Sequence, residues 1–491
     1  MYRPLIYSDL PDPDIIRVGD TYYMISTAMH MFPGGDLYSS RDLMTWELCC
    51  HLYDKLDETP SQQLKEGHIY GQGMWAACLR HHEGLFHVFF VCNDTHKTYH
   101  FTASQPEGPW QWHHVEGFYH DCSVLFEDGH AYIVYGNREI RLTELNDTLT
   151  GPKEGGIDTV ILRDLPPKKI KLGFEGTHFY KIGGRYCLFF IHWPRGGMRT
   201  EACYVSDTLT GPYTGGDVLQ DDMGFFGQGV AQGGIVQDPE GKWHALLFQD
   251  HGAVGRVPVL CDVVWKDGFP VFSIADLPPQ TDADVRALYA AEEDFTAPLS
   301  SMWQFNHQPS DHACETSPEG LTVQLMPAAD MEHARNTLTQ RAFGPRCRVS
   351  VQADASLLQE GGRMGLGVLQ GCFAGLFIEK KNGRYQLGLE TRVAEKQQLK
   401  SDEPVSVSML MPLFSPKVRL NMDMDFTDMK DTVTFSVTLA GRTLPVGLPH
   451  RLHYRLDHFM GARIALYGYD TEGTGSRARF TGYTCQLIEN S

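Results

Sequence analysis

The chain has 491 residues, which is more than one hydrophobic core usually spans, so we expect two domains. Its 42 Lys and Arg residues against 61 Asp and Glu residues give a net charge of −19, which disfavours nucleic acid and anionic membranes as partners. The sequence starts without the basic and apolar regions of a secretory signal, and no run approaches the roughly 20 apolar residues of a membrane helix. These features predict a cytoplasmic protein that binds a neutral partner.

The first half of the sequence repeats a turn followed by an aromatic residue in an apolar run. The matching aromatic residues of the five copies are Tyr22, Phe86, Tyr132, Tyr186 and Trp243. They are 46 to 64 residues apart, about the length of one four-stranded propeller blade. Related turn-rich stretches occur at 40–46, 105–110, 147–152 and 207–212. We therefore predict a five-bladed β-propeller over residues 1–275, with a generic β-sandwich as the alternative.

The repeat ends near residue 275, where the pattern of the sequence changes. Residues 276–292 are interpreted as a linker. Because this linker lacks a long Ser/Gly tract, the two domains should be docked on each other. From residue 293 onward, apolar and polar residues alternate between Gly, Asn and Asp turns, as in GLTVQLMP at 320–327. This alternation predicts an antiparallel β-sandwich over residues 293–491 and an all-β fold for the whole chain.

Three carboxylates occupy equivalent places in three of the predicted blades. Cleavage of a glycosidic bond needs one carboxylic acid to protonate the leaving oxygen and one carboxylate to activate water or attack carbon. Asp12, Asp121 and Glu175 each precede the aromatic residue of their blade by 10 or 11 positions, near the expected start of an innermost strand. Asp14 is the rival to Asp12, because residues two apart on a strand point to the same side.

Several segments resemble glycoside hydrolase family 43, the family of inverting β-xylosidases, α-L-arabinofuranosidases and arabinanases. PDPDIIRVGDTYYMIS (11–26) is similar to the first blade of the family, and GQGMWAACLR (71–80) to its Trp-Ala-Pro segment. FEGTHFYKIGGRYCLFF (174–190) resembles the segment of its general acid. LSSMWQFNHQP (299–309) looks like the concanavalin-like sandwich of the two-domain, exo-acting members. The resemblance thus covers both predicted domains.

The resemblance implies a role for each of the three carboxylates. The general base of the family falls on Asp12 and the general acid on Glu175. Asp121 matches the aspartate that modulates the pKa of the acid and orients the substrate. A neighbouring carboxylate disfavours ionisation of an acid that must stay protonated near neutral pH, so this division of roles is physically consistent.

The same resemblance implies four substrate-binding residues. Trp75 and Phe32 match aromatic residues that wall the sugar pocket, with a role in the core as the alternative for each. Arg256 matches an arginine that binds the substrate near the base, with a surface salt bridge as the alternative. His251 lies in the same segment and is expected to line the pocket.

The function implied is that of an inverting exo-glycosidase that releases xylose or arabinose from oligosaccharides. The alternatives are an endo-arabinanase, another pentose- or galactose-specific glycosidase, or a non-catalytic sugar-binding propeller. No cofactor or catalytic metal is expected. Gln232 stands where many family members carry a histidine that helps to hold calcium, so a structural calcium ion in the channel is left open, as is a homo-oligomer.

Overall fold

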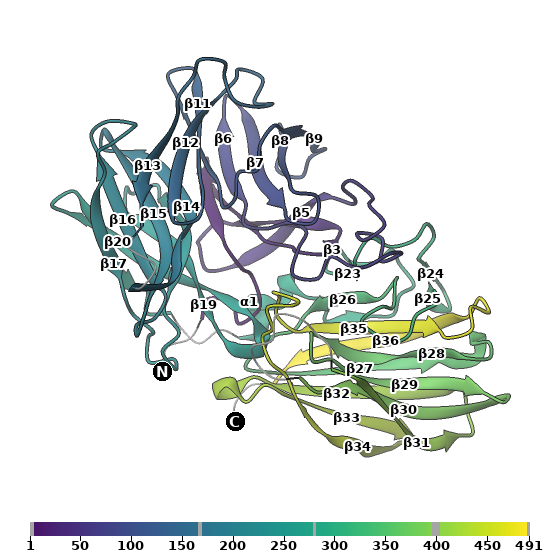
Figure 1. The fold of residues 1–491 in the computed structure, drawn as a ribbon. Helices are drawn as coiled ribbons and strands as arrows, with labels where there is room; N and C mark the ends of the chain where they lie inside the picture. The colour runs from purple at the N-terminus through teal and green to yellow at the C-terminus, as the bar shows by residue number, and fades with distance from the viewer. Residues whose placement is uncertain (1–3, 165–168, 278–280, 395–402, 489–491) are drawn as a thin grey trace.

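A computed structural model describes residues 4–164, 169–277, 281–394 and 403–488. Within these residues the strands form five four-stranded sheets and two eight-stranded sheets. The five small sheets follow one another around a propeller, and the two large sheets form a sandwich beside it (Figure 1). The predicted five-bladed propeller followed by a β-sandwich is therefore confirmed. No helix in the described residues is long and apolar enough to cross a bilayer.

The first three blades are antiparallel sheets whose strands follow chain order. Blade 1 contains β1 (Asp14–Val18), β2 (Thr21–Ser26), β4 (Gly34–Ser40) and β5 (Trp46–Tyr53). Blade 2 contains β6 (Cys78–His82), β7 (Leu85–Cys92), β8 (Lys97–Ala103) and β9 (Gln111–Val115). Blade 3 contains β10 (Ser123–Glu127), β11 (His130–Tyr135), β12 (Glu139–Leu145) and β13 (Asp158–Arg163).

The last two blades have the same order and close the ring. Blade 4 contains β14 (Ile170–Ile182), β15 (Arg185–Pro194), β16 (Thr200–Ser206) and β17 (Thr214–Leu219). Blade 5 contains β18 (Ala231–Gln237), β19 (Trp243–Asp250), β20 (Arg256–Lys266) and β21 (Phe269–Ile274). The first strands of neighbouring blades contact one another, and β18 contacts β1, so these strands surround the channel. Each repeated aromatic residue lies in the second strand of its blade, and each of the related turns joins a third strand to a fourth.

The sandwich consists of two antiparallel sheets. One has the order β24-β25-β36-β27-β32-β33-β34, with β22 paired to β36, and the other has the order β3-β23-β26-β35-β28-β29-β30-β31. The strands of the first sheet are β22 (Glu292–Glu293), β24 (Cys314–Ser317), β25 (Gly320–Gln324), β27 (Arg346–Asp354), β32 (Lys417–Asp425), β33 (Thr432–Leu439), β34 (Arg442–Arg451) and β36 (Arg477–Leu487). Those of the second are β3 (Met31–Phe32), β23 (Gln304–Asn306), β26 (Leu338–Arg341), β28 (Gly362–Leu369), β29 (Ala374–Lys381), β30 (Arg384–Arg392), β31 (Val405–Leu413) and β35 (Arg463–Asp470).

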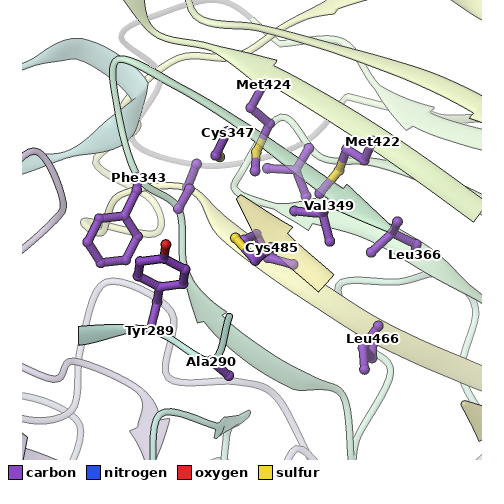
Figure 2. Packing of buried hydrophobic residues seen from close by; sticks show 14 of the residues in the cluster. Tyr289, Ala290, Phe343, Cys347, Val349, Leu366, Met422, Met424, Leu466 and Cys485 are labelled. Carbon is purple, nitrogen blue, oxygen red and sulfur yellow. The ribbon is translucent and has the colours of Figure 1, made fainter. Parts of the chain in front are cut away.

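The core of the sandwich lies between the two sheets (Figure 2). Side chains alternate across each strand, so Val349 and Met422 of the first sheet face Leu366 and Leu466 of the second, and all four are fully buried. The same cluster includes Tyr289, which follows the short helix α1 (Asp282–Val285) and is 3% exposed. This part of the predicted linker is therefore packed against the sandwich.

Strand pairing and buried polar contacts join the two domains. β3 comes from the loop between the second and third strands of blade 1, yet it pairs with β23 of the sandwich. Asp36 of blade 1 pairs with Arg341 of the sandwich at 2.5 Å. Asp9 accepts a hydrogen bond from the backbone N–H of Gly461 at 2.8 Å. Because these contacts are buried, the sandwich has a fixed position beside the propeller.

Candidate active site

A cavity of about 440 Å³ opens where the innermost strands of the propeller begin. Every blade contributes a side chain from its first strand or from the residues just before that strand. These residues are Asp12, Trp75, Asp121, Glu175 and Gln232. Asp12 and Asp121 both lie two residues before their strand, with φ of 53° and 49°. Aspartate tolerates this left-handed conformation better than most residues do, and the shared turn directs both carboxylates into the cavity.

Asp12 is held by two donors at the floor of the cavity. The guanidinium of Arg256 donates to its Oδ1 at 2.6 Å, and the hydroxyl of Thr27 donates to its Oδ2 at 3.0 Å. Burial raises the pKa of Asp12, while Arg256 acts to lower it. The residue is 6% exposed and lines the cavity, so its carboxyl group is held there in a fixed orientation.

Asp14 has different surroundings from Asp12. Its carboxylate is fully buried and accepts hydrogen bonds from the guanidinium of Arg80 at 2.7 Å and from the backbone N–H of Leu79 at 2.8 Å. Its other oxygen lies 3.2 Å from Nδ1 of His178. Burial opposes ionisation, but Arg80 and His178 outweigh it and lower the pKa of Asp14 to about 2. Asp14 therefore joins the innermost strands together and does not line the cavity.

Asp121 and Glu175 meet on the other side of the cavity, because blades 3 and 4 are neighbours. One oxygen of each carboxylate and a ring nitrogen of His120 all lie within 4.8 Å of one another. Asp121 accepts a hydrogen bond from the backbone N–H of Gly176 at 2.9 Å, and Glu175 accepts one from the side-chain amide of Asn137. The side chain of Glu175 is 21% exposed, so it is accessible from the cavity.

The charges of this group shift the pKa of its members. Burial raises the pKa of Asp121, the nearby Glu175 carboxylate raises it further, and His120 acts in the opposite direction. Burial disfavours the charged form of His120, but Asp121 and Glu175 outweigh it and raise the pKa of His120 to about 9. The raised pKa favours the charged form of His120, whose Nε2 lies 3.6 Å from Asp121 and 4.0 Å from Glu175.

Aromatic side chains from both domains form the rest of the cavity wall. The ring of Trp75 lies 5.6 Å from that of His120 and 5.8 Å from that of Phe459, which the sandwich contributes. Phe459 also lies against the guanidinium of Arg256, at 4.6 Å. The indole Nε1 of Trp75 is buried and has no hydrogen-bond partner in the described part of the chain.

Five of the seven site residues inferred from the sequence line the cavity, namely Asp12, Trp75, Asp121, Glu175 and Arg256. Phe32 and His251 do not. Phe32 is 1% exposed and belongs to β3, where its ring contacts that of Tyr53, so it occupies the core. His251 is stacked on Phe225 at 3.9 Å, and its Nε2 lies 2.8 Å from Oε1 of Gln249. These placements correct the expectation that both side chains line the sugar pocket.

The sequence interpretation missed three residues that the structure places in the site. His120 and Asn137 contact the carboxylate pair, and Phe459 closes one side of the cavity. The position of His120 next to Asp121 was a usable signal. Phe459 offered none, because Trp75 and Arg256, which it contacts in the cavity wall, are more than 200 residues away in the sequence.

The surroundings of Gln232 do not match a calcium site. Ca²⁺ takes six to eight oxygen ligands, usually several of them carboxylates. The backbone N–H of Gln232 donates to the buried Glu201 at 2.8 Å, and the nearby Asp14 is already paired with Arg80. Two clusters of His, Asp and Glu side chains in the described residues have metal-ligand spacing. One is the His120 group, and in the other Glu332 is already paired with Arg392 and His458.

Two family models match the chain in the order of its domains. Residues 1–270 match the model for glycosyl hydrolases family 43, and residues 292–485 match the model for the beta xylosidase C-terminal concanavalin A-like domain. The chain belongs to glycosyl hydrolase family 43. This family 43 glycoside hydrolase is thus an enzyme whose catalytic propeller carries the cavity described above.

Relatives of this family 43 enzyme cover it to different extents. A putative beta-xylosidase of Xylanibacter ruminicola is 32% identical over 406 residues, which are 75% of this chain and 73% of the relative. A non-reducing end alpha-L-arabinofuranosidase of Bacteroides ovatus is 29% identical over 55% of this chain and 52% of its own length. A solved structure described as a bifunctional GH43-CE protein of Bacteroides eggerthii has 36% identity and a TM-score of 0.91, and covers 99% of this chain and 64% of its own chain.

Proposed function

We propose that this family 43 enzyme is an inverting exo-glycosidase that releases xylose or arabinose units from xylo- or arabino-oligosaccharides. The observation that carries the proposal is the cavity itself, in which Asp12 and the pair Asp121–Glu175 come from different blades and face one enclosed space. Relatives named beta-xylosidase and alpha-L-arabinofuranosidase support the choice of a pentose as the sugar released.

In the proposed mechanism, Glu175 donates its proton to the glycosidic oxygen as the bond from that oxygen to the anomeric carbon breaks. Asp12 accepts a proton from the water that attacks the anomeric carbon from the opposite face, so the configuration inverts. Arg256 and Thr27 support this role, because they fix the orientation of the Asp12 carboxylate. Asp121 is proposed to keep the acid and the sugar in position, with the backbone N–H of Gly176 holding its own carboxylate.

Exo action is proposed because the sandwich contributes to the cavity wall. Leu456 and Phe459 line the cavity from the sandwich side, opposite residues of the propeller. An enzyme that cleaves internal bonds needs a groove open at both ends, and an endo-arabinanase is therefore disfavoured. A non-catalytic sugar-binding propeller is disfavoured as well, because both an acid and a base candidate are present in the cavity.

Three further properties stay predictions. The proposed chemistry uses protein carboxylates alone, so the enzyme is expected to need no cofactor. The cytoplasmic location expected from the sequence and the assembly state are both open to direct measurement by fractionation and by light scattering.

Rates on para-nitrophenyl β-D-xylopyranoside, α-L-arabinofuranoside and β-D-galactopyranoside test the proposal. We expect hydrolysis of one or both pentosides, no hydrolysis of the galactoside, and release of monosaccharide alone from a xylo- or arabino-oligosaccharide. Early appearance of shortened oligosaccharides without monosaccharide would show endo action. Binding of the sugars without hydrolysis of any substrate would show a binding propeller.

A further inference from the structure

The first hairpin of blade 4 is longer than its counterparts and forms one wall of the cavity. The innermost strands β1, β6 and β10 have five residues each, whereas β14 has 13. The additional residues lie before Glu175 and pair with the end of β15, with Leu172 opposite Trp193 and Ile170 opposite Pro194. Because Lys171, Leu172 and Trp193 all line the cavity, this extension borders the bound substrate.

The extension carries positive charge beside an aromatic ring. The ammonium nitrogen of Lys171 lies 3.4 Å from the ring centroid of Trp193, and the guanidinium of Arg199 lies 5.6 Å from the same ring. Arg199 is neutralised by Asp250 at 2.9 Å. Lys171 is exposed, and no carboxylate in the described residues lies within 4.0 Å of its ammonium group. An uncompensated cation in the cavity wall is notable in a chain with a net charge of −19.

The position of Lys171 relative to Glu175 indicates which part of the substrate it would meet. The proposed general acid contacts the leaving oxygen, so residues on the acid's side of the cavity border the leaving group. Lys171 precedes Glu175 by four residues on the same strand, which is about 13 Å along an extended chain. Both side chains line the cavity, so Lys171 lies outward from the acid, where the leaving group would extend.

We infer that Lys171 and Trp193 form a leaving-group subsite that favours substrates with a carboxylate in the leaving group, such as an oligosaccharide that carries a uronic acid. This inference rests on the proposed function. The ammonium of Lys171 pairs with the carboxylate, and the indole of Trp193 holds that ammonium at the cavity wall. Since the site is partly open to solvent, the preference is modest, about three- to tenfold in kcat/KM.

Two aryl glycosides of the pentose that the enzyme accepts test the inference. Their leaving groups are para-carboxyphenol, which is anionic, and para-carbamoylphenol, which is neutral and has nearly the same shape. We expect Lys171→Met to lower kcat/KM for the carboxyphenyl glycoside by about three- to tenfold and to change that for the carbamoylphenyl glycoside by less than about twofold. Lys171→Arg should keep most of the wild-type ratio of kcat/KM for the carboxyphenyl glycoside to kcat/KM for the carbamoylphenyl glycoside. For the wild-type enzyme, 0.5 M NaCl should reduce this ratio.

The matched control is Lys169→Met, which removes the same charge two residues away on the same segment. Lys169 is exposed and does not line the cavity, so its variant should keep the wild-type ratio between the two substrates. If Lys171→Met and Lys169→Met lowered kcat/KM for the carboxyphenyl glycoside equally, the effect would come from the overall positive charge of this segment. The proposed subsite would then be refuted. Equal losses on both substrates in Lys171→Met would also refute it, because Lys171 would then only support Trp193. If wild-type enzyme hydrolyses neither glycoside, the proposed function fails first.

Discussion

Asp12 and Asp14 are two residues apart, yet the propeller gives their carboxylates opposite electrostatic surroundings. Burial is the largest effect on both. For Asp12 it prevails and raises the pKa, whereas for Asp14 the combined effects of Arg80, His178 and the backbone N–H of Leu79 outweigh it and lower the pKa to about 2. A raised pKa means that the folded state opposes the charge of Asp12, and a lowered pKa means that it favours the charge of Asp14.

Matched asparagine variants should separate these two roles. Asp14→Asn removes a favourable charge and leaves the buried Arg80 without its partner, so we expect a loss of at least about 2 kcal/mol in the free energy of unfolding. Asp12→Asn should abolish most activity with a smaller loss of stability, because Arg256 keeps Asp250 at 3.7 Å. Denaturant unfolding and initial rates measure both effects. An active Asp12→Asn enzyme would contradict the assignment of the base.

The role of Glu175 can be tested through the leaving group. Glu175→Ala should lose most of its activity on xylo-oligosaccharides, whose leaving oxygen needs a proton, and far less on dinitrophenyl glycosides, whose leaving group departs as an anion. Asp12→Ala should impair both substrates, because water must be activated in either case. Equal losses for Glu175→Ala on both substrates would instead indicate a structural role.

The site could be predicted from the sequence only where a residue keeps a fixed place in the blade repeat. Asp12, Asp121 and Glu175 do so, and the structure brings all three to one cavity. The alternation of side chains along a strand could not show which of Asp12 and Asp14 lines the cavity. Asp14 is kept out of it by the ion pair with Arg80, which comes from another blade. Phe32 was misplaced because pairing of β3 with the sandwich turns its ring into the core.

The sequence repeat predicted the four-stranded blades, but it did not predict the extra strand β3 or the extension of β14. The aromatic residue of each copy marks a second strand, because the turn before it joins the first two strands of the blade. β3 has two residues and exists only through its pairing with β23, so no local pattern could reveal it. The long β14 was hidden as well, since its extension follows the partner strand β15.

The loop that carries Phe459 is the element through which the sandwich reaches the cavity. Phe459→Ala should lower kcat/KM on short oligosaccharides by about three- to tenfold, because the aromatic contacts with Trp75 and Arg256 are lost. Phe414→Ala is the control, since Phe414 is fully exposed on the same domain. Equal kinetics in both variants would show that the sandwich does not act on the substrate.

Deleting the whole sandwich would be a less informative test. Without it, β3 loses its partner strand and the buried Asp36 loses Arg341. Asp36 would keep only His51 at 2.8 Å, and the strand pairing would be lost as well, so a propeller that ends near residue 285 is expected to fold poorly. The single change at Phe459 avoids this difficulty.

Buried neutral histidines should make the whole molecule sensitive to mild acid. Burial lowers the pKa of His30 and His307 well below the usual value, and it lowers that of His87 to about 4 and that of His251 to about 3. Below pH 6.5 these histidines bind protons in the unfolded chain but not in the folded protein, so their contribution to the free energy of unfolding falls as the pH falls. Each such group contributes up to about 1.4 kcal/mol per pH unit.

His30 allows a direct check of this pH dependence. Its ring lies among those of Tyr70, His307 and His458, and neither ring nitrogen has a hydrogen-bond partner in the described residues. When the pH is lowered from 6.5 to 5, the stability of His30→Phe should therefore decrease less than that of the wild type. Thermal unfolding at both pH values measures this difference. The same substitution at the exposed His312 is the control. An unchanged slope in His30→Phe would show that His30 does not titrate as proposed.

The stereochemistry of hydrolysis distinguishes Asp12 acting as a base from Asp12 acting as a nucleophile. If Asp12 activates water on one face of the sugar while Glu175 protonates the leaving oxygen on the other, the two carboxyl groups should be about 6.5–9.5 Å apart and the anomeric configuration should invert. Proton NMR of the first sugar released from a β-D-xyloside, or from an α-L-arabinofuranoside if that is the better substrate, reports the configuration before mutarotation. Inversion gives α-xylose from the xyloside and β-arabinose from the arabinofuranoside. Release of a sugar with the configuration of its substrate would contradict it, because Asp12 would then not act as the base that activates water.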